Sequence, residues 1–97
     1  MKVVKSLSFD KWLSKLNDTI AKTAIIRRID KIRNQNHIGD YKHIEGEIFE
    51  LRIFVSKGYR LYFTAKNGEL IILLCGGDKD TQDRDISKAK EILKDYL

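Results

Sequence analysis

Residues 58–79 read GYRLYFTAKNGELIILLCGGDK, and this stretch decides the fold of the chain. Asn67-Gly68 separates two segments rich in aromatic and β-branched residues, which is typical of the two-residue turn of a β-hairpin. The run from Leu70 to Cys75 is apolar at every position, as in a central strand that is covered on both faces. The stretch therefore predicts a hairpin whose second strand is buried.

A further strand precedes this hairpin. Phe49, Leu51, Ile53 and Val55 alternate with more polar residues, and 56–58 is a short turn, so an antiparallel meander of three strands is expected. After the buried strand, Gly76-Gly77-Asp78-Lys79 is expected to connect to a last helix, with Asp80 or Thr81 as its N-cap. The spacing of the apolar residues predicts that this helix covers the second face of the sheet. These residues are Ile86, Ala89, Leu93 and Leu97.

The first half of the chain predicts a short strand at 3–6 and two helices. The first helix carries apolar residues at positions 9, 12, 13 and 16 after Ser8 as N-cap, and the second spans 19–33 after Asn17-Asp18. Residues 34–41 are expected to be the longest loop. The order of elements predicts one α+β domain over residues 1–97, in which the N-terminal strand joins the antiparallel meander and a helical hairpin and a C-terminal helix pack on the sheet.

Composition narrows the function classes. The 97 residues carry a formal net charge of +5, with a basic side on the second predicted helix, which favours a polyanion or an acidic protein as partner. No apolar run approaches the length of about 20 residues that a membrane-spanning helix needs, and we expect a cytoplasmic protein without a membrane partner. The single Cys75 has apolar neighbours and is interpreted as a buried thiol.

Two arginines are the first candidate site. If the meander pairs as its short turn suggests, Arg52 and Arg60 project from one face of the sheet, with Glu50 on the same face. Their forked donors match the geometry of a phosphate group. A cross-strand ion pair between Arg60 and Glu50 that only decorates the sheet explains the pattern equally well.

Other polar residues give weaker patterns. The glycines before Lys79 permit a close backbone approach, and Lys79 is placed to reach a phosphate, but a plain connection between strand and helix also accounts for them. His37 and His43 lack further ligands at metal-binding spacing, so no metal site and no cofactor is predicted. His43 is a candidate for proton transfer, or else a surface histidine without a role.

Several segments together resemble one family, the RelE/ParE superfamily of bacterial toxins, in the HigB-related branch called addiction-module killer proteins. The resemblance covers nearly the whole chain. It is carried by residues 12–13, 50–53, 58–63, 73–79, 82 and 85–86, and above all by the Gly-Tyr-Arg and Gly-Gly-Asp-Lys segments. The resemblance implies a RelE-like fold, with two N-terminal helices against a curved antiparallel sheet and a C-terminal helix, which agrees with the order of elements read from the residues.

The resemblance implies the toxin of a type II toxin–antitoxin system, a metal-independent endoribonuclease that cuts translated mRNA in the ribosome and inhibits translation. The ribose 2′-hydroxyl would attack the adjacent phosphate, and basic side chains would stabilise the added charge. Arg52, Arg60 and Lys79 fall at basic positions of the family and would fulfil this role. Substrate-binding candidates are Lys57, Tyr59, Gln82 and Arg84.

This sequence departs from the family at two positions. A RelE-type tyrosine near the start of the last helix is replaced by Asp85, and Glu50 stands where a second basic residue is expected. The general acid and base therefore stay open among Glu50, His43 and Asp85. The missing tyrosine leaves two alternatives: a ParE-like toxin that inhibits DNA gyrase by binding it, or an inactive member that only binds a partner.

The family also implies a partner of its own. We expect a cognate antitoxin, commonly a small helix-turn-helix protein, that masks the site of the toxin and brings the complex to operator DNA. The basic second helix or the sheet is expected to meet acidic residues of this antitoxin, with association strengthened at low salt.

Overall fold

A computed structural model describes the whole chain, Met1–Leu97, and contains one five-stranded sheet in the order β1-β5-β4-β3-β2. The strands are β1 (Lys2–Lys5), β2 (Tyr41–Glu45), β3 (Ile48–Ile53), β4 (Tyr59–Lys66) and β5 (Leu70–Asp78). The helices are α1 (Leu7–Lys15), α2 (Thr19–Gln35) and α3 (Gln82–Leu93), with 3₁₀ turns η1 (Lys79–Thr81) and η2 (Lys94–Tyr96). The predicted α+β architecture is confirmed. The sheet is mixed, because β1 pairs with β5 in parallel.

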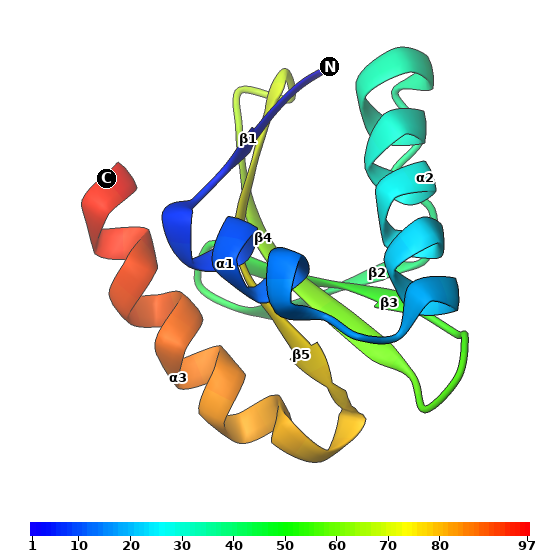
Figure 1. Cartoon of the computed structure of the whole chain (residues 1–97). Coiled ribbons are helices and arrows are strands. Elements are labelled where there is room, and N and C mark those ends of the chain that lie inside the picture. The colour runs from blue at the N-terminus through cyan, green and yellow to red at the C-terminus, as the bar shows by residue number, and fades with distance from the viewer.

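Strand β5 is an interior strand between β1 and β4, covered on both faces as predicted, and separates two hydrophobic cores. Ile71 and Leu73 face the core beneath α1 and α2, whereas Ile72 and Leu74 face the core beneath α3. Helices α1 and α3 pack on opposite faces of β5, since Gly76 meets Trp12 of α1 and Gly77 meets Asp85 of α3. Figure 1 shows both helices beside this strand. The hairpin turn before β5 is also confirmed, since Asn67 and Gly68 have φ angles of 55° and 67°.

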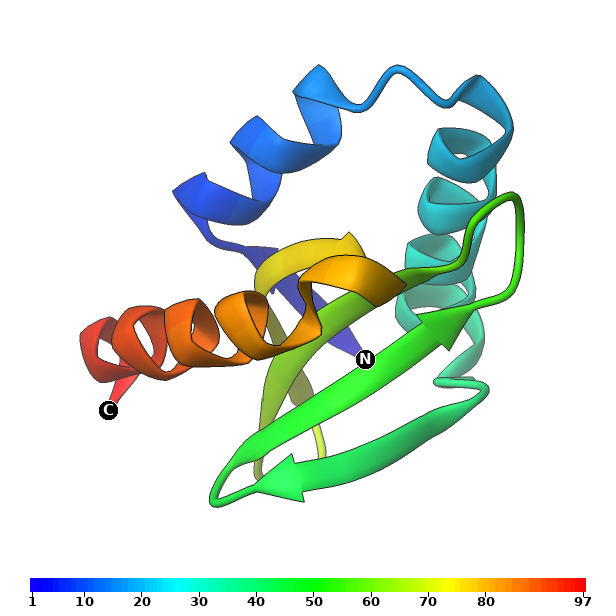
Figure 2. The same cartoon turned by 90° about the horizontal axis from the view of Figure 1, so that it is seen from below.

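The two N-terminal helices are splayed rather than packed along their length. Figure 2 shows them at opposite ends of one face of the sheet, joined by an extended linker. The linker contains Asp18, which caps α2 by accepting a hydrogen bond from the backbone N–H of Ala21 at 3.0 Å. The predicted cap of the second helix is thus confirmed. No helix combines the length and the apolar character needed to cross a membrane.

Helix α1 begins earlier than its apolar pattern predicted, and Ser8 is not its N-cap. The cap is Ser6, whose buried Oγ accepts a hydrogen bond from the N–H of Phe9 at 3.0 Å and donates one to the carbonyl of Leu74 at 2.6 Å. One hydroxyl therefore both caps the helix and fixes it to β5. The apolar period alone led to the prediction of Ser8, and the contact of Ser6 with β5 is not visible in that period.

Replacing Ser6 by alanine removes both hydrogen bonds and leaves the carbonyl of Leu74 without this donor. We expect Ser6→Ala to lower the free energy of unfolding by about 2 kcal/mol, measured by urea denaturation. Ser8→Ala is the matched control and should change it by less than about 0.5 kcal/mol. Equal losses in the two variants would contradict the assignment of the cap.

The loop predicted at residues 34–41 is shorter than expected, because α2 extends to Gln35 and β2 begins at Tyr41. Helix α2 continues to Gln35 and ends at Asn36, which adopts the left-handed conformation with φ 55°. After a short connection the chain forms β2, a strand that was not predicted because its residues are mostly polar. It forms because Tyr41 contacts the rings of Phe49 and Phe63, so an exposed edge strand gains an aromatic anchor.

The end of β5 also differs from the prediction. Gly76, Gly77 and Asp78 are the last residues of the strand rather than a connecting loop, and neither glycine has a positive φ. Asp78 caps η1 through a hydrogen bond from the N–H of Asp80 at 2.9 Å. Thr81 is at the N-cap position of α3, as predicted, but makes no side-chain cap bond. Leu97 is exposed and does not extend the apolar face of the helix.

Candidate functional site

The arginine cluster comprises Glu50, Arg52 and Arg60 on the α3 face of the sheet. Arg52 and Arg60 are direct register partners of β3 and β4, as predicted. The carboxylate of Glu50 is fully buried and accepts a hydrogen bond from Nε2 of Gln82 at 3.2 Å. Arg60 Nε lies 4.0 Å from Glu50 Oε2, so the cross-strand ion pair is present. Lys42 Nζ approaches the other carboxylate oxygen at 3.9 Å.

Four buried polar atoms in and beside this cluster lack a hydrogen-bond partner: Glu50 Oε1, Arg52 Nε, Arg60 Nε and the hydroxyl of Tyr62. Burial, and after it the neighbouring Glu50 carboxylate, raises the pKa of Tyr62, so the phenol stays protonated at physiological pH. Buried polar atoms are nearly always paired, and their concentration here is unusual. The α3 face of β3 and β4 therefore carries buried donors and acceptors that the protein itself leaves unpaired.

The cations of the cluster differ in accessibility. The side chain of Arg52 is 32% exposed and bonded to Asp40 at 3.2 Å, whereas that of Arg60 is 17% exposed. Glu50 is held beneath Gln82, the first residue of α3. A phosphate can thus approach the arginines from the surface, while Glu50 is placed to orient Arg60 from below.

His43 is not brought to this cluster. It pairs with Phe49 in the β2–β3 ladder, and its ring contacts the Phe49 ring at a centroid distance of 5.3 Å on the α2 face of the sheet. Its Nε2 is 2.7 Å from the carbonyl oxygen of Gly46. Of the three predicted acid or base candidates, His43 therefore lies on the opposite face from Arg60.

Asp85 is buried and serves the packing of α3 on β5. Its Oδ2 accepts a hydrogen bond from the Thr81 hydroxyl and lies so close to Gly77 that a Cβ there would come within 1.7 Å of it. The other glycine is covered from the α1 side, where a Cβ on Gly76 would lie 2.4 Å from the ring of Trp12. Close approach was one of the two interpretations of these glycines, and the groups that approach them are side chains of the protein.

Lys79 and Arg84 lie at the start of the C-terminal helical region. Both are exposed, in η1 and the first turn of α3. Arg84 Nε is 3.7 Å from Asp85 Oδ1, but the Arg84 side chain is 77% exposed, so solvent screens the pair. These two cations add positive charge beside Gln82, at the edge of the arginine cluster.

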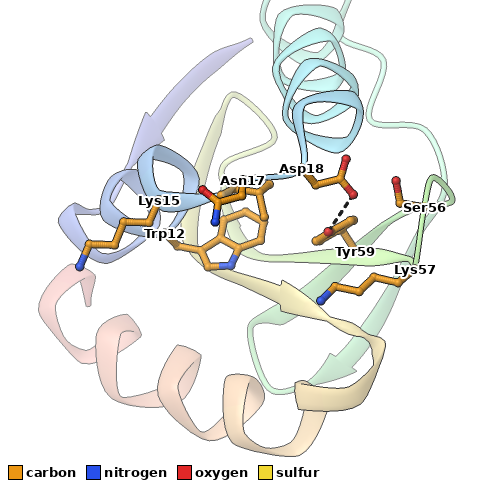
Figure 3. A pocket seen from close by; sticks show the side chains of 8 residues that line it. Trp12, Lys15, Asn17, Asp18, Ser56, Lys57 and Tyr59 are labelled. Carbon is orange, nitrogen blue, oxygen red and sulfur yellow. Dashed lines mark hydrogen bonds between the residues drawn. The ribbon is translucent and has the colours of Figure 1, made fainter.

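Lys57 and Tyr59, the remaining predicted substrate contacts, lie elsewhere. They line a cleft of about 600 Å³ between the α1–α2 linker and the β3–β4 turn, which we call the linker cleft (Figure 3). The hydroxyl of Tyr59 donates to Asp18 Oδ2 at 3.1 Å, and Lys57 Nζ lies 3.2 Å from Asp78 Oδ2. Trp12 also lines the cleft. Its role was missed because position 12 fits the apolar stripe of a helix.

Not every basic residue is available to a ligand. Arg28 of α2 donates from Nε to the carbonyl of Ile38 at 2.9 Å and from Nη2 to the carbonyls of Asp40 and Arg52, each at 3.3 Å. Its half-buried guanidinium, whose pKa burial lowers, thus ties α2 to the loop and to β3. The basic side predicted for the second helix therefore offers fewer free cations than its sequence suggests, because the Arg28 guanidinium is already bonded to backbone carbonyls.

Cys75 is buried beneath α3, as predicted, and its thiol donates to the carbonyl of Asp85 at 3.3 Å. Burial, with a smaller contribution from the Asp85 charge, raises the pKa of the thiol to about 12. Because the thiolate is the reactive form, we expect negligible labelling by a disulfide reagent at pH 8 in the native protein and rapid labelling in urea. Rapid labelling without denaturant would contradict this placement.

No group of three or more His, Cys, Asp or Glu side chains is arranged to hold a metal ion.

Similarity to known proteins identifies the family of the chain. The model of the family described as phage derived protein Gp49-like (DUF891) matches residues 11–94. The chain belongs to this family. An uncharacterized protein of Haemophilus influenzae is 50% identical to the Gp49-like chain over 90 residues, which are 93% of this chain and 90% of the relative.

A solved structure supports the fold. One chain in the crystal structure of the RelB–RelE antitoxin–toxin complex from Methanococcus jannaschii superimposes with a TM-score of 0.65 and 20% identity, covering 84% of the Gp49-like chain and 96% of its own. The predicted RelE-like fold is confirmed. Family and fold agree with the predicted RelE/HigB-like relationship, whereas the killer-protein branch stays a prediction.

Proposed function

We propose that this Gp49-like protein is the toxin of a bacterial type II toxin–antitoxin pair and acts as an endoribonuclease on translated mRNA. The observation that carries the proposal is the register pair of Arg52 and Arg60 beside the buried carboxylate of Glu50. Two guanidiniums on one face of a rigid sheet offer the forked donors that bind a phosphate and its developing charge.

The proposed reaction uses the substrate's own nucleophile. The ribose 2′-oxygen forms a bond to the adjacent phosphorus as its proton leaves to a base, and the bond from phosphorus to the 5′-oxygen of the next nucleotide breaks. The products are a 2′,3′-cyclic phosphate and a 5′-hydroxyl, whose oxygen takes up a proton from a general acid or from water. Arg60 and Arg52 stabilise the charge on the phosphoryl oxygens, with Lys79 at the edge of the site. Among the candidate bases, Glu50 is the one paired with Arg60, and its burial means that Gln82 must move before it accepts a proton directly.

The proposal includes the partners of such a toxin. A cognate antitoxin, which we expect to be a helix-turn-helix protein, would mask the arginine cluster and carry the complex to operator DNA. The fold likeness to a chain of an antitoxin–toxin complex supports a partner of this kind. Since translating ribosomes would present the mRNA, the proposed place of action is the bacterial cytoplasm.

The test is expression of the chain without antitoxin in a bacterial host, with the 5′ ends of mRNA mapped by primer extension. New 5′ ends inside reading frames, absent when translation is blocked beforehand, are expected. Growth arrest with intact mRNA and DNA damage would instead support the gyrase-inhibiting alternative. Normal growth at a confirmed protein level would favour a member that only binds a partner.

A further inference from the structure

The linker cleft has a volume suited to one nucleotide. Its approximately 600 Å³ lie in the range of cavities that bind small organic molecules. The α1–α2 linker forms one wall and the β3–β4 turn the other, and Figure 3 shows Trp12, Tyr59 and Lys57 around the same hollow. The cleft is distinct from the arginine cluster, which lies on the other face of β4.

The floor of the cleft is aromatic and fixed in position. Trp12 packs against Gly76 on one side and contacts the rings of Phe9 and Tyr59 at centroid distances of 5.7 and 6.4 Å. Tyr59 is buried and anchored through its hydroxyl to Asp18. The partly exposed indole is therefore a rigid apolar surface that a flat ring can contact at low entropic cost.

The rim of the cleft is basic and polar. Lys15 and Lys57 line it from α1 and from the β3–β4 turn, and Asn17 adds an exposed amide that both donates and accepts hydrogen bonds. The hydrogen bond with Asp78, and after it the charge of that carboxylate, raises the pKa of Lys57 and keeps it cationic. An aromatic floor with cations at its rim matches a base joined to a phosphate.

We infer that the linker cleft binds one unpaired nucleotide of the RNA, with its base against Trp12 and its phosphate at Lys57 or Lys15. The inference rests on the proposed function and names a second contact for the same substrate. Tyr59 and Arg60 are consecutive residues of β4 that face opposite sides of the sheet. A single strand that passes the end of β4 can therefore reach both the cleft and the arginine cluster.

The chain has a single tryptophan, so its fluorescence reports on the cleft directly. We would titrate the protein with a trinucleotide whose riboses are 2′-O-methylated, because this probe cannot be cleaved. A saturable change in Trp12 emission is expected, with affinity about tenfold lower for a probe that lacks the central base. No saturable change, or equal affinity for the abasic probe, would overturn the inference.

Variants separate the cleft from the cleavage site. Lys15→Ala removes an exposed cation without an ion pair and should weaken the fluorescence titration, as should Lys57→Ala, whereas Lys31→Ala on α2 should not. Arg60→Ala should keep the signal and lose cleavage. A saturable signal in a protein that cuts no RNA would refute the proposed function but not nucleotide binding in the linker cleft. Cleavage without a signal would refute only the binding of a nucleotide in this cleft.

Discussion

Arg60→Ala is expected to reduce RNA cleavage by about 10²–10³-fold, as is typical when one preorganised donor to a transition-state charge is removed. Arg60 is the less exposed of the paired arginines and the one whose guanidinium adjoins Glu50. Its position is therefore better defined than that of a surface cation. The measurement is the rate of new 5′-end formation on a translated mRNA, with wild type and variant at equal concentration.

The loss has to be separated from a loss of stability. Removing Arg60 leaves the buried Glu50 charge without this partner, and breaking a buried ion pair costs about 3–5 kcal/mol, an upper value here because Arg60 is partly exposed. The double variant Arg60→Ala with Glu50→Gln removes both charges. It should recover much of the stability in a thermal melt and stay inactive.

Two further outcomes test the role of the guanidinium itself. Arg60→Lys keeps the charge but loses the fork, so partial activity is expected. Arg33→Ala on α2, which removes an exposed arginine whose Nη1 lies 3.6 Å from Asp30 Oδ1 in an ion pair, should leave cleavage unchanged. Full activity in the folded double variant would show that the arginine cluster is not the site of cleavage.

Local sequence patterns predicted those elements of the fold whose conformation depends mainly on their own residues. Asn67-Gly68 specifies its turn because both residues accept positive φ, and the apolar run of β5 specifies a strand covered on both faces. Strand β2 could not be predicted this way. Its stability comes from contacts of Tyr41 with rings far along the chain, which no local period reveals.

The same distinction holds for the candidate site. The alternation of β3 and β4 was enough to place Arg52, Arg60 and Glu50 on one face, because register follows from the short turn. The side of the sheet on which His43 lies depends on strand β2. Because this strand was not predicted, the sequence could not show that His43 and Arg60 lie on opposite faces. Trp12 belongs to a helical stripe and also lines the linker cleft, and its place there depends on the packing of α1 against Gly76, which the helical period does not show.

Gly77→Ala is expected to lower the free energy of unfolding by about 3 kcal/mol, the upper end of the usual cost of overpacking. A Cβ at this position would lie 1.7 Å from Asp85 Oδ2 and 2.8 Å from the Thr81 hydroxyl oxygen, so α3 must shift away from β5. For a domain of this size such a loss lowers Tm by at least roughly 12 °C. Thermal unfolding followed by circular dichroism measures it.

The cause can be tested by removing the group that the new methyl meets. Asp85→Ala should itself destabilise the protein, because it removes the acceptor of the Thr81 hydroxyl, yet the double variant with Gly77→Ala should be less destabilised than the sum by about 1–3 kcal/mol. Asp85→Asn keeps the bulk and should give no such relief. Gly46→Ala, where φ is 50° and no atom lies within 4 Å, measures backbone strain alone. Strict additivity of Gly77→Ala and Asp85→Ala would mean that Asp85 is not the group that the new methyl meets.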